Sequence, residues 1–156
     1  MSRARELDAI DRKLLVELQR DASLSHADLA ERVGASTASC WRRIRALEAA
    51  GVLGRHVRLV DPESVGRGVN VLCHIRMKDH SAKATEAFET FVASRDEIME
   101  CYSMSGDWDY LLRIIVTDVD HYNHFLMRIV LRHPSVATGS SHFSLAQVKY
   151  ITAIPL

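Results

Sequence analysis

Apolar residues recur at the spacing of an α-helix in three short segments before residue 51. The first segment follows Asp8, a typical N-cap, and its apolar face consists of Leu7, Ile10, Leu14 and Leu18. The second begins at Ser25, which pairs with Asp28 in a helix-start signature, and it ends at Gly34. The third begins at Ser36, and its buried face consists of Cys40, Ile44 and Leu47. The pattern predicts three short helices, the last two joined by a tight turn.

The period of the apolar pattern changes after Gly51. Residues 52–60 are β-branched and basic, and Asp61-Pro62 interrupts them. The rest of the chain predicts strands at 69–77, 98–104, 108–116 and 136–150, and helices at 81–95 and 118–132. This β-α-β-β-α-β order is that of the ferredoxin-like fold. We therefore expect an α+β protein with a helix-turn-helix domain in residues 1–60 and a ferredoxin-like domain in residues 61–156.

The predicted sheet is expected to leave one face uncovered. Two helices cover only one side of a four-stranded sheet, and the other side must meet a partner or solvent. In a chain of 156 residues the expected partner is a second copy, because most soluble oligomers are symmetric homo-oligomers. We predict an obligate dimer formed by sheet packing.

The overall charge hides an asymmetry between the two halves. Residues 1–60 hold eleven Lys and Arg against eight Asp and Glu, a net charge of +3, and residues 61–156 hold nine against twelve, a net charge of −3. Residues 42–58 contain five arginines and one acidic residue, Glu48. The arginines are Arg42, Arg43, Arg45, Arg55 and Arg58. Such a basic cluster suits a phosphate backbone.

Other compositional features favour a cytoplasmic protein. The chain has no apolar run of about 18 residues and no signal-peptide pattern at its start. Its three cysteines, Cys40, Cys73 and Cys101, are widely spaced and lack a paired metal-ligand pattern, so we expect them to be reduced core residues.

The third helix is predicted to read DNA. Its first residues are short enough for the backbone to enter the major groove, and they are Ser36, Thr37, Ala38 and Ser39. Thr37 is the best base reader among them. We expect the outer surface of the helix to carry Arg42, Arg43 and Arg45 beside the phosphates. Trp41 either packs against the first helix or contacts the sugar-phosphate edge or a thymine methyl group.

The turn at 105–107 and the strand that follows are unusually acidic. Asp107 and Asp109 lie two residues apart, so both point to one face in extended backbone, and Gly106 allows close approach of a ligand. The carboxylates can hold the ammonium group of a free amino acid. Its carboxylate can bind the amides near Gly106 and the hydroxyls of Ser103, Ser105, Ser140 and Ser141. The alternative is a hairpin turn in which aspartate caps backbone amides.

Two motifs carry a family resemblance, and together they extend over nearly the whole chain. The first comprises Leu29-Ala30, Val33-Gly34, Cys40, Arg43-Ile44, Leu47-Glu48 and Gly51-Val52, and the second comprises Glu100-Cys101 and residues 105–112. With these motifs the chain resembles the leucine-responsive/asparagine-responsive (Lrp/AsnC) family of transcription regulators. The resemblance implies a winged helix-turn-helix, a β-linker and a ferredoxin-like ligand-sensing domain. It also implies dimers that often assemble to octamers.

The resemblance further implies that a small effector, usually an amino acid, binds between dimers near the glycine-aspartate turn. Carried over to this chain, the effector site consists of Ser103, Met104, Gly106, Asp107, Asp109, Val119, His142, Phe143 and Ser144. Two positions depart from the family pattern. Trp108 stands where Tyr or Phe is frequent, which can narrow the pocket, and His142 replaces a common aromatic residue, which can add a polar contact.

Three other functions are weighed against this prediction. Some heme-biosynthetic decarboxylases resemble the family in both domains, and Asp107, Asp109 and His142 can then act as acid and base. A stand-alone metabolite-binding module should lack the basic residues of the third helix, which are present. His121 and His124 have ligand spacing on a helix, but no acidic or thiol group completes a zinc site. We therefore expect a DNA-binding regulator with no enzymatic activity, no cofactor and no metal.

Overall fold

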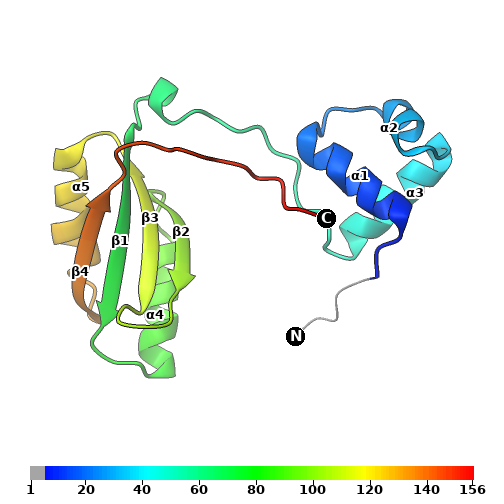
Figure 1. Cartoon of the computed structure of the whole chain (residues 1–156). Coiled ribbons are helices and arrows are strands. Elements are labelled where there is room, and N and C mark those ends of the chain that lie inside the picture. The colour runs from blue at the N-terminus through cyan, green and yellow to red at the C-terminus, as the bar shows by residue number, and fades with distance from the viewer. Residues whose placement is uncertain (1–5) are drawn as a thin grey trace. The chain divides into compact units, whose positions relative to one another are not determined.

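The computed structural model describes residues 6–156, which form two compact units. The helical unit comprises the residues up to Arg58 together with Val148–Leu156, and the sheet unit comprises Leu59–Gln147. In chain order (Figure 1) the elements are α1 (Ala9–Arg20), α2 (His26–Val33), α3 (Thr37–Ala49), η1 (Glu63–Val65), β1 (Val69–Met77), α4 (Ala82–Ala93), β2 (Ile98–Ser103), β3 (Tyr110–Val116), α5 (Val119–Phe125), η2 (Leu126–Val130) and β4 (Val136–Phe143). Within residues 6–156, no helix combines the length and the apolar character needed to cross a membrane.

Side-chain caps set the ends of the helices in the helical unit, as the sequence predicts. The Asp8 carboxylate accepts a hydrogen bond from the backbone nitrogen of Asp11 at 2.8 Å. Ser25 and Asp28 form a complete capping box, and Gly34 ends α2 with φ of 72°. The apolar faces of the three helices meet in one core that contains Leu14, Leu29, Ala30, Val33 and Cys40. This core fixes the direction in which α3 presents its outer surface.

The last residues of the chain belong to the helical unit. The Gln19 side-chain amide donates to the carbonyl oxygen of Ile154 at 3.2 Å, and its carbonyl oxygen accepts from the Ile154 backbone nitrogen at 2.7 Å. The strand predicted for residues 136–150 ends at Phe143, and the remainder runs without a strand partner within the described chain. Residues 52–60, the predicted wing and linker strand, also run without strand pairing in the described chain.

The sheet unit has the predicted ferredoxin-like order of elements. Its four strands are antiparallel in the order β2-β3-β1-β4, so β1 pairs with both β3 and β4. The helices α4 and α5 lie on the same side of this sheet (Figure 1), where they enclose a core with the strand residues that point toward them. Its largest fully buried side chains include Phe88 and Phe125. The predicted strand 69–77 coincides with β1.

The other face of the sheet exposes apolar and imidazole side chains. On β1 the residues facing away from the helices include Leu72, which is 39% exposed, and His74. Their neighbours across the strands are Leu111 and His142. The expected open face is therefore present in the described chain.

One cysteine prediction is wrong. Cys40 and Cys73 are buried, but Cys101 is exposed. Cys101 faces the helix side of β2, but β2 is an edge strand of the sheet and α4 does not close over it. The prediction considered the number and spacing of the cysteines, which do not reveal that this strand lies at an uncovered edge.

His133 should make the stability of the sheet unit depend on pH. Its ring lies 4.8 Å from that of Phe91, and its Nδ1 accepts a hydrogen bond from the Ser135 backbone nitrogen. Burial lowers the pKa of His133 below its usual value of 6.5. Since the unfolded chain binds this proton more readily, stability should be complete above about pH 6.5 and fall progressively below it. Urea unfolding between about pH 8 and pH 5 measures the loss.

His133→Asn is the matched variant for this prediction. Its side-chain oxygen can replace Nδ1 as acceptor, and it does not titrate. We expect the variant to show a flatter dependence of unfolding free energy on pH than the natural chain. Identical pH profiles for the two proteins would contradict the prediction.

Candidate DNA-binding and effector sites

The start of α3 presents a small, exposed surface. The Ser36 hydroxyl caps the helix by accepting from the Ser39 backbone nitrogen at 3.2 Å. Thr37 and Ala38 are exposed beyond this cap, and Trp41 is 52% exposed, so Trp41 is not buried against α1. Short side chains at the N-terminus of a helix leave room for its backbone to approach a nucleic acid.

Two of the three predicted arginines extend from this surface. Arg42 is exposed, and Arg45 is exposed with one ion pair to Glu48 at 3.3 Å. Such an exposed pair one turn apart contributes little to stability, so Arg45 can exchange it for a phosphate at small cost. Arg42 and Arg45 are three residues apart and therefore share one side of the helix.

Arg43 was predicted to lie on the outer surface, and this is wrong. Its Nη1 donates to Asp8 and Asp11, both at 2.7 Å, so it joins α3 to the start of α1. The Arg43 side chain is 23% exposed and that of Asp11 is 5% exposed. These carboxylates raise the pKa of Arg43, with the hydrogen bond to Asp11 as the largest cause. Arg43 therefore stabilises the helical unit and is turned away from the surface that was predicted to face DNA.

The glycine-aspartate turn is held by β1. Gly106 has φ of 109°, a conformation that favours glycine. The guanidinium of Arg76 donates through Nε and Nη2 to the carbonyl oxygen of Asp107, at 3.1 and 2.8 Å, and lies 5.0 Å from the ring centre of Trp108. The Asp107 carboxylate is exposed, and no hydrogen bond to it is found within residues 6–156. The turn is thus rigid at its backbone and presents one carboxylate outward.

Asp109 has a structural role in this turn. Its Oδ2 accepts from the backbone nitrogen of Met77 at 2.7 Å, and its Oδ1 lies 2.8 Å from Nε2 of His80. The Met77 amide, then His80, lower the pKa of Asp109. Asp109 therefore caps a backbone amide, as in the alternative that the sequence left open for this turn. The carboxylates of Asp107 and Asp109 are therefore not equivalent, although residues two apart in extended backbone point to the same face.

The predicted effector residues form two groups at opposite ends of the sheet. Ser103, Met104, Gly106, Asp107 and Asp109 lie at the turn, next to the start of β3. Val119 follows the far end of β3, and Phe143 pairs with Val71 near that same end. The strand β3 spans about 20 Å at 3.3 Å per residue. The prediction that Phe143 lies opposite the turn is therefore wrong within one chain.

Residues of the last strand divide further by face. The ring of Phe143 packs on Tyr122 of α5 at 5.3 Å, so it lies on the helix-covered side. His142 lies on the open face, 5.3 Å from the ring of His74, which in turn lies 5.8 Å from Trp108. Ser144 is exposed, and its backbone nitrogen donates a hydrogen bond to the backbone carbonyl oxygen of Asn70. Only His142 is connected to the turn, through the rings of His74 and Trp108.

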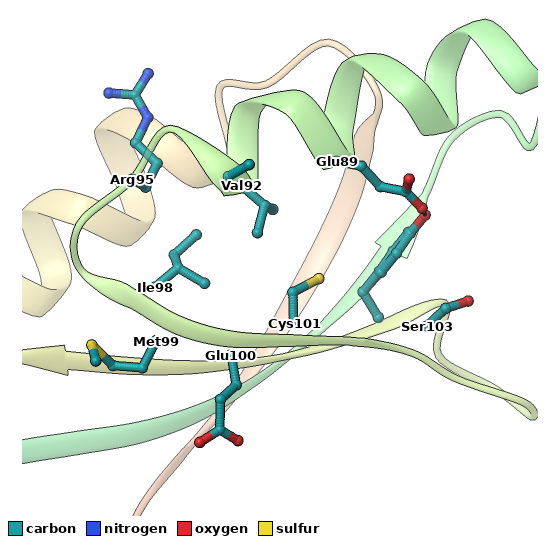
Figure 2. Close-up of a pocket in the computed structure, with 10 residues that line it drawn as sticks. Glu89, Val92, Arg95, Ile98, Met99, Glu100, Cys101 and Ser103 are labelled. Carbon is teal, nitrogen blue, oxygen red and sulfur yellow. Dashed lines mark hydrogen bonds between the residues drawn. The ribbon is translucent and has the colours of Figure 1, made fainter. Parts of the chain in front are cut away.

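A cavity of about 390 Å³ adjoins the turn, between α4 and β2. Figure 2 shows Val92, Ile98 and Cys101 pointing toward one another inside it, while Arg95 and Glu100 point away. The Glu89 carboxylate at one end accepts a hydrogen bond from the Tyr110 hydroxyl at 2.9 Å. Burial, together with Glu89, raises the pKa of Tyr110 to about 12 and that of Cys101 to about 11.

Glu89, which lines the cavity, and Arg76, which holds the turn, were not predicted from the sequence. The position of Glu89 beside Tyr110 depends on how α4 packs on the sheet. Arg76 was a polar residue of an alternating strand, and its contact with residues 31 positions later depends on strand pairing. One feature of the sequence could have indicated the position of Glu89. It lies three residues before the apolar Val92, so the two side chains share one side of the helix.

A metal centre finds no support among the described residues. Within residues 6–156, no group of three or more His, Cys, Asp or Glu side chains is arranged to hold a metal ion. His121 instead lies 3.1 Å from the Thr117 hydroxyl and 3.8 Å from a Glu97 carboxylate oxygen. His124 is exposed.

Sequence profiles of two known domains match the two parts of the chain. Residues 7–48 match the AsnC-type helix-turn-helix domain, and residues 70–154 match the Lrp/AsnC ligand binding domain. The chain belongs to the Lrp/AsnC family of transcription regulators. The helix-turn-helix assigned to α2 and α3 and the ferredoxin-like sheet unit are thus its DNA-binding and ligand-binding domains.

Individual Lrp/AsnC proteins match almost from end to end. The chain is 39% identical over 150 residues to the DNA-binding transcriptional activator DecR of Escherichia coli (strain K12), covering 96% of this chain and 99% of DecR. It is 39% identical over 152 residues to the glutamate uptake regulatory protein of Zymomonas mobilis, covering 97% and 92%. A crystal structure of a Neisseria meningitidis transcriptional regulator in complex with L-methionine matches with a TM-score of 0.92 and 33% identity, covering 96% and 97%.

These Lrp/AsnC relatives are transcription regulators, and regulators are not enzymes. The chain is accordingly a DNA-binding transcription regulator with a ligand-binding domain.

Proposed function

We propose that this protein is a cytoplasmic, non-enzymatic regulator that binds operator DNA through α3 and changes its DNA affinity or assembly when an amino acid binds. The observation that carries the proposal is the pairing of an exposed α3 surface with a second domain that holds a carboxylate-bearing, glycine-containing turn. The solved relative in complex with L-methionine supports an amino acid as the effector.

In the proposed DNA complex, α3 lies in the major groove. Thr37 and Ala38 face base edges, while Ser36 and Ser39 hold the helix start and approach the backbone. Arg42 and Arg45 contact phosphates, and Trp41 contacts the sugar-phosphate edge. Arg43 contributes indirectly, because its ion pairs hold α3 on α1.

The effector site is proposed to draw on two copies of the chain. One copy contributes the turn group, and another contributes Val119, Phe143 and Ser144 from the opposite end of its sheet. The distance of about 20 Å between these groups in a single chain supports this arrangement. Occupation by an amino acid then stabilises one assembly of the copies, and ligand and operator affinities become linked reciprocally.

The open sheet face is proposed to be the dimer interface, with further assembly to an octamer. Replacing Leu72 with glutamate puts a charge into the centre of this face, and a desolvated charge opposes association. We expect sedimentation velocity to show a dimer or larger species for the natural chain and a monomer for Leu72→Glu. Val65→Glu is the matched control, because Val65 is an exposed apolar residue of η1, outside the sheet. A monodisperse monomer for the natural chain at micromolar concentration would contradict the proposal.

A thermal-shift screen of the twenty amino acids tests the effector assignment. A ligand that binds only the folded protein adds about 2.7 kcal/mol of stability at 100 times its dissociation constant. We expect at least one amino acid to raise the melting temperature and to change the affinity for operator DNA. If none of the twenty changes DNA affinity, amino-acid regulation is excluded.

A further inference from the structure

A second cavity lies within the helical unit. All three helices of this unit contribute to its lining, together with residues 53–56, which follow α3. Its volume of about 300 Å³ is at the lower end of the range of about 300 to 1,000 Å³ that is usual for ligand pockets. The cavity is therefore large enough for a small organic molecule.

The floor of this cavity is apolar. Leu29 of α2 is 1% exposed, and the half-buried side chains of Leu18, Leu24 and Ile44 pack against the same core. Leu53, also half-buried, adds a further apolar side chain from beyond α3. An apolar group that enters the cavity is removed from water beside these residues, and this burial stabilises the complex.

The mouth of the cavity is polar. Its exposed side chains are those of His26, Glu48, Arg55 and His56. The Glu48 carboxylate already pairs with Arg45 at 3.3 Å. In contrast, the side chains of Arg55 and His26 have no hydrogen bond or ion pair within residues 6–156.

A second carboxylate near the mouth, that of Asp21, also has partners. It accepts hydrogen bonds from the hydroxyl and the backbone nitrogen of Ser23, at 2.6 and 2.9 Å. These bonds are the largest cause that lowers the pKa of Asp21, and the charge of His56 is a smaller one. Among the described residues that line the cavity, Arg55 is thus the permanent charge without a partner. A guanidinium group binds a carboxylate through two parallel hydrogen bonds.

We propose that the helical unit holds a ligand site of its own, separate from the effector site of the sheet unit, for a small carboxylate with an apolar body. The apolar body lies on the floor formed by Leu18, Leu29 and Ile44, and the carboxylate binds the Arg55 guanidinium. A ligand with an ammonium group in this place is repelled by Arg55. An inorganic anion leaves the apolar floor in contact with water and therefore binds more weakly.

Occupation of this site should compete with DNA for Arg55. Arg55 belongs to the basic cluster of residues 42–58, which suits a phosphate backbone. A carboxylate on Arg55 withdraws one positive charge from the DNA. The ligand should therefore weaken binding to all DNA sequences and lower the salt dependence of binding by about one unit of slope.

Calorimetry with phenylacetate and phenylacetamide tests the site on the full chain, because these probes share a ring and differ in charge. We expect the natural chain to bind phenylacetate at least tenfold more tightly than phenylacetamide. Arg55→Gln should lose this preference. Arg58→Gln is the matched control and should keep it, since Arg58 is an exposed arginine of the same segment that does not line the cavity. Glu48→Gln should bind phenylacetate more tightly, because a like charge leaves the mouth.

Fluorescence anisotropy with a duplex of arbitrary sequence supplies a second readout. Saturating phenylacetate should lower the DNA affinity and the salt slope of the natural chain and of Arg58→Gln, and should change neither in Arg55→Gln. Equal affinities for the two probes, no binding of phenylacetate at millimolar concentration, or equal phenylacetate affinity in Arg55→Gln and the natural chain would overturn the site. Each of these results leaves the proposed amino-acid regulation intact, because that regulation is assigned to the sheet unit.

Discussion

Replacing Arg43 with alanine is expected to destabilise the helical unit by about 2 to 3 kcal/mol. The substitution leaves Asp11, whose side chain is 5% exposed, without its charged partner. Removal of one partner from a fully buried ion pair costs about 3 to 5 kcal/mol, and the value here is lower because Asp8, the second carboxylate, is largely exposed. Urea unfolding followed by circular dichroism measures this loss in the helical unit.

Arg42→Ala is the matched control, because Arg42 is an exposed neighbour on the same helix. Its stability should change by less than about 0.5 kcal/mol, as is usual for surface substitutions. Its DNA affinity, in contrast, should fall for all sequences, and the salt dependence of binding should decrease by about one unit of slope. At temperatures where Arg43→Ala remains folded, its salt slope should equal that of the natural chain. A reduced slope in Arg43→Ala with unchanged stability would reverse these assignments.

Replacing Phe88 with alanine is expected to destabilise the sheet unit by about 3 to 5 kcal/mol. Phe88 is fully buried in the core between α4 and the sheet, and its ring lies 4.9 Å from that of Tyr110 and 5.6 Å from His133. Alanine removes the ring and leaves a cavity that the surrounding strands cannot close. The two units have separate cores, so the loss should appear in the transition of the sheet unit and leave that of the helical unit in place.

Phe88→Leu provides the graded control for this prediction, since leucine fills most of the space of the ring. Phe88→Leu should lower the free energy of unfolding by clearly less than Phe88→Ala does. Differential scanning calorimetry distinguishes the two transitions, and trypsin digestion identifies which unit has unfolded. A Phe88→Ala protein whose transitions match those of the natural chain would contradict the assignment of this core.

Local signals in the sequence were reliable because the interactions behind them are local. The caps expected at Asp8, Ser25 and Ser36 are all formed, and each joins residues within three positions of one another. The period of two in residues 69–77 identified both the strand and its buried face, because alternation depends only on the backbone of that strand. The order of elements then sufficed for the ferredoxin-like fold.

Residues whose role depends on a distant partner were misjudged. Arg43 pairs with aspartates more than 30 positions earlier, and its positive charge suggested DNA contact. Its spacing from Cys40 and Leu47 placed it on the buried face of α3, and that signal was overlooked. Asp109 likewise pairs with the Met77 amide, 32 positions away, which depends on the pairing of β1 with β3.

The arrangement of the proposed effector residues was only partly predictable for the same reason. Its turn group is contiguous in sequence and remains together in the structure. The position of Phe143 depends on the register of β4 against β1, where it pairs with Val71, and no short-range pattern determines that register. The position of Glu89 in the wall of the cavity was not predicted, because a carboxylate on an amphipathic helix usually faces solvent.

The central claim is that α3 of this protein reads a specific DNA sequence. Its most direct test is the ratio of affinities of the full chain for a duplex selected from a random library and for a scrambled duplex of the same composition, measured by fluorescence anisotropy at fixed salt. We expect a ratio of at least about 10³, the lower end for specific regulators. Thr37→Ala should reduce this ratio more than it reduces affinity for the scrambled duplex. A ratio near one for the natural chain, or a ratio that Thr37→Ala leaves unchanged, would contradict sequence reading by α3.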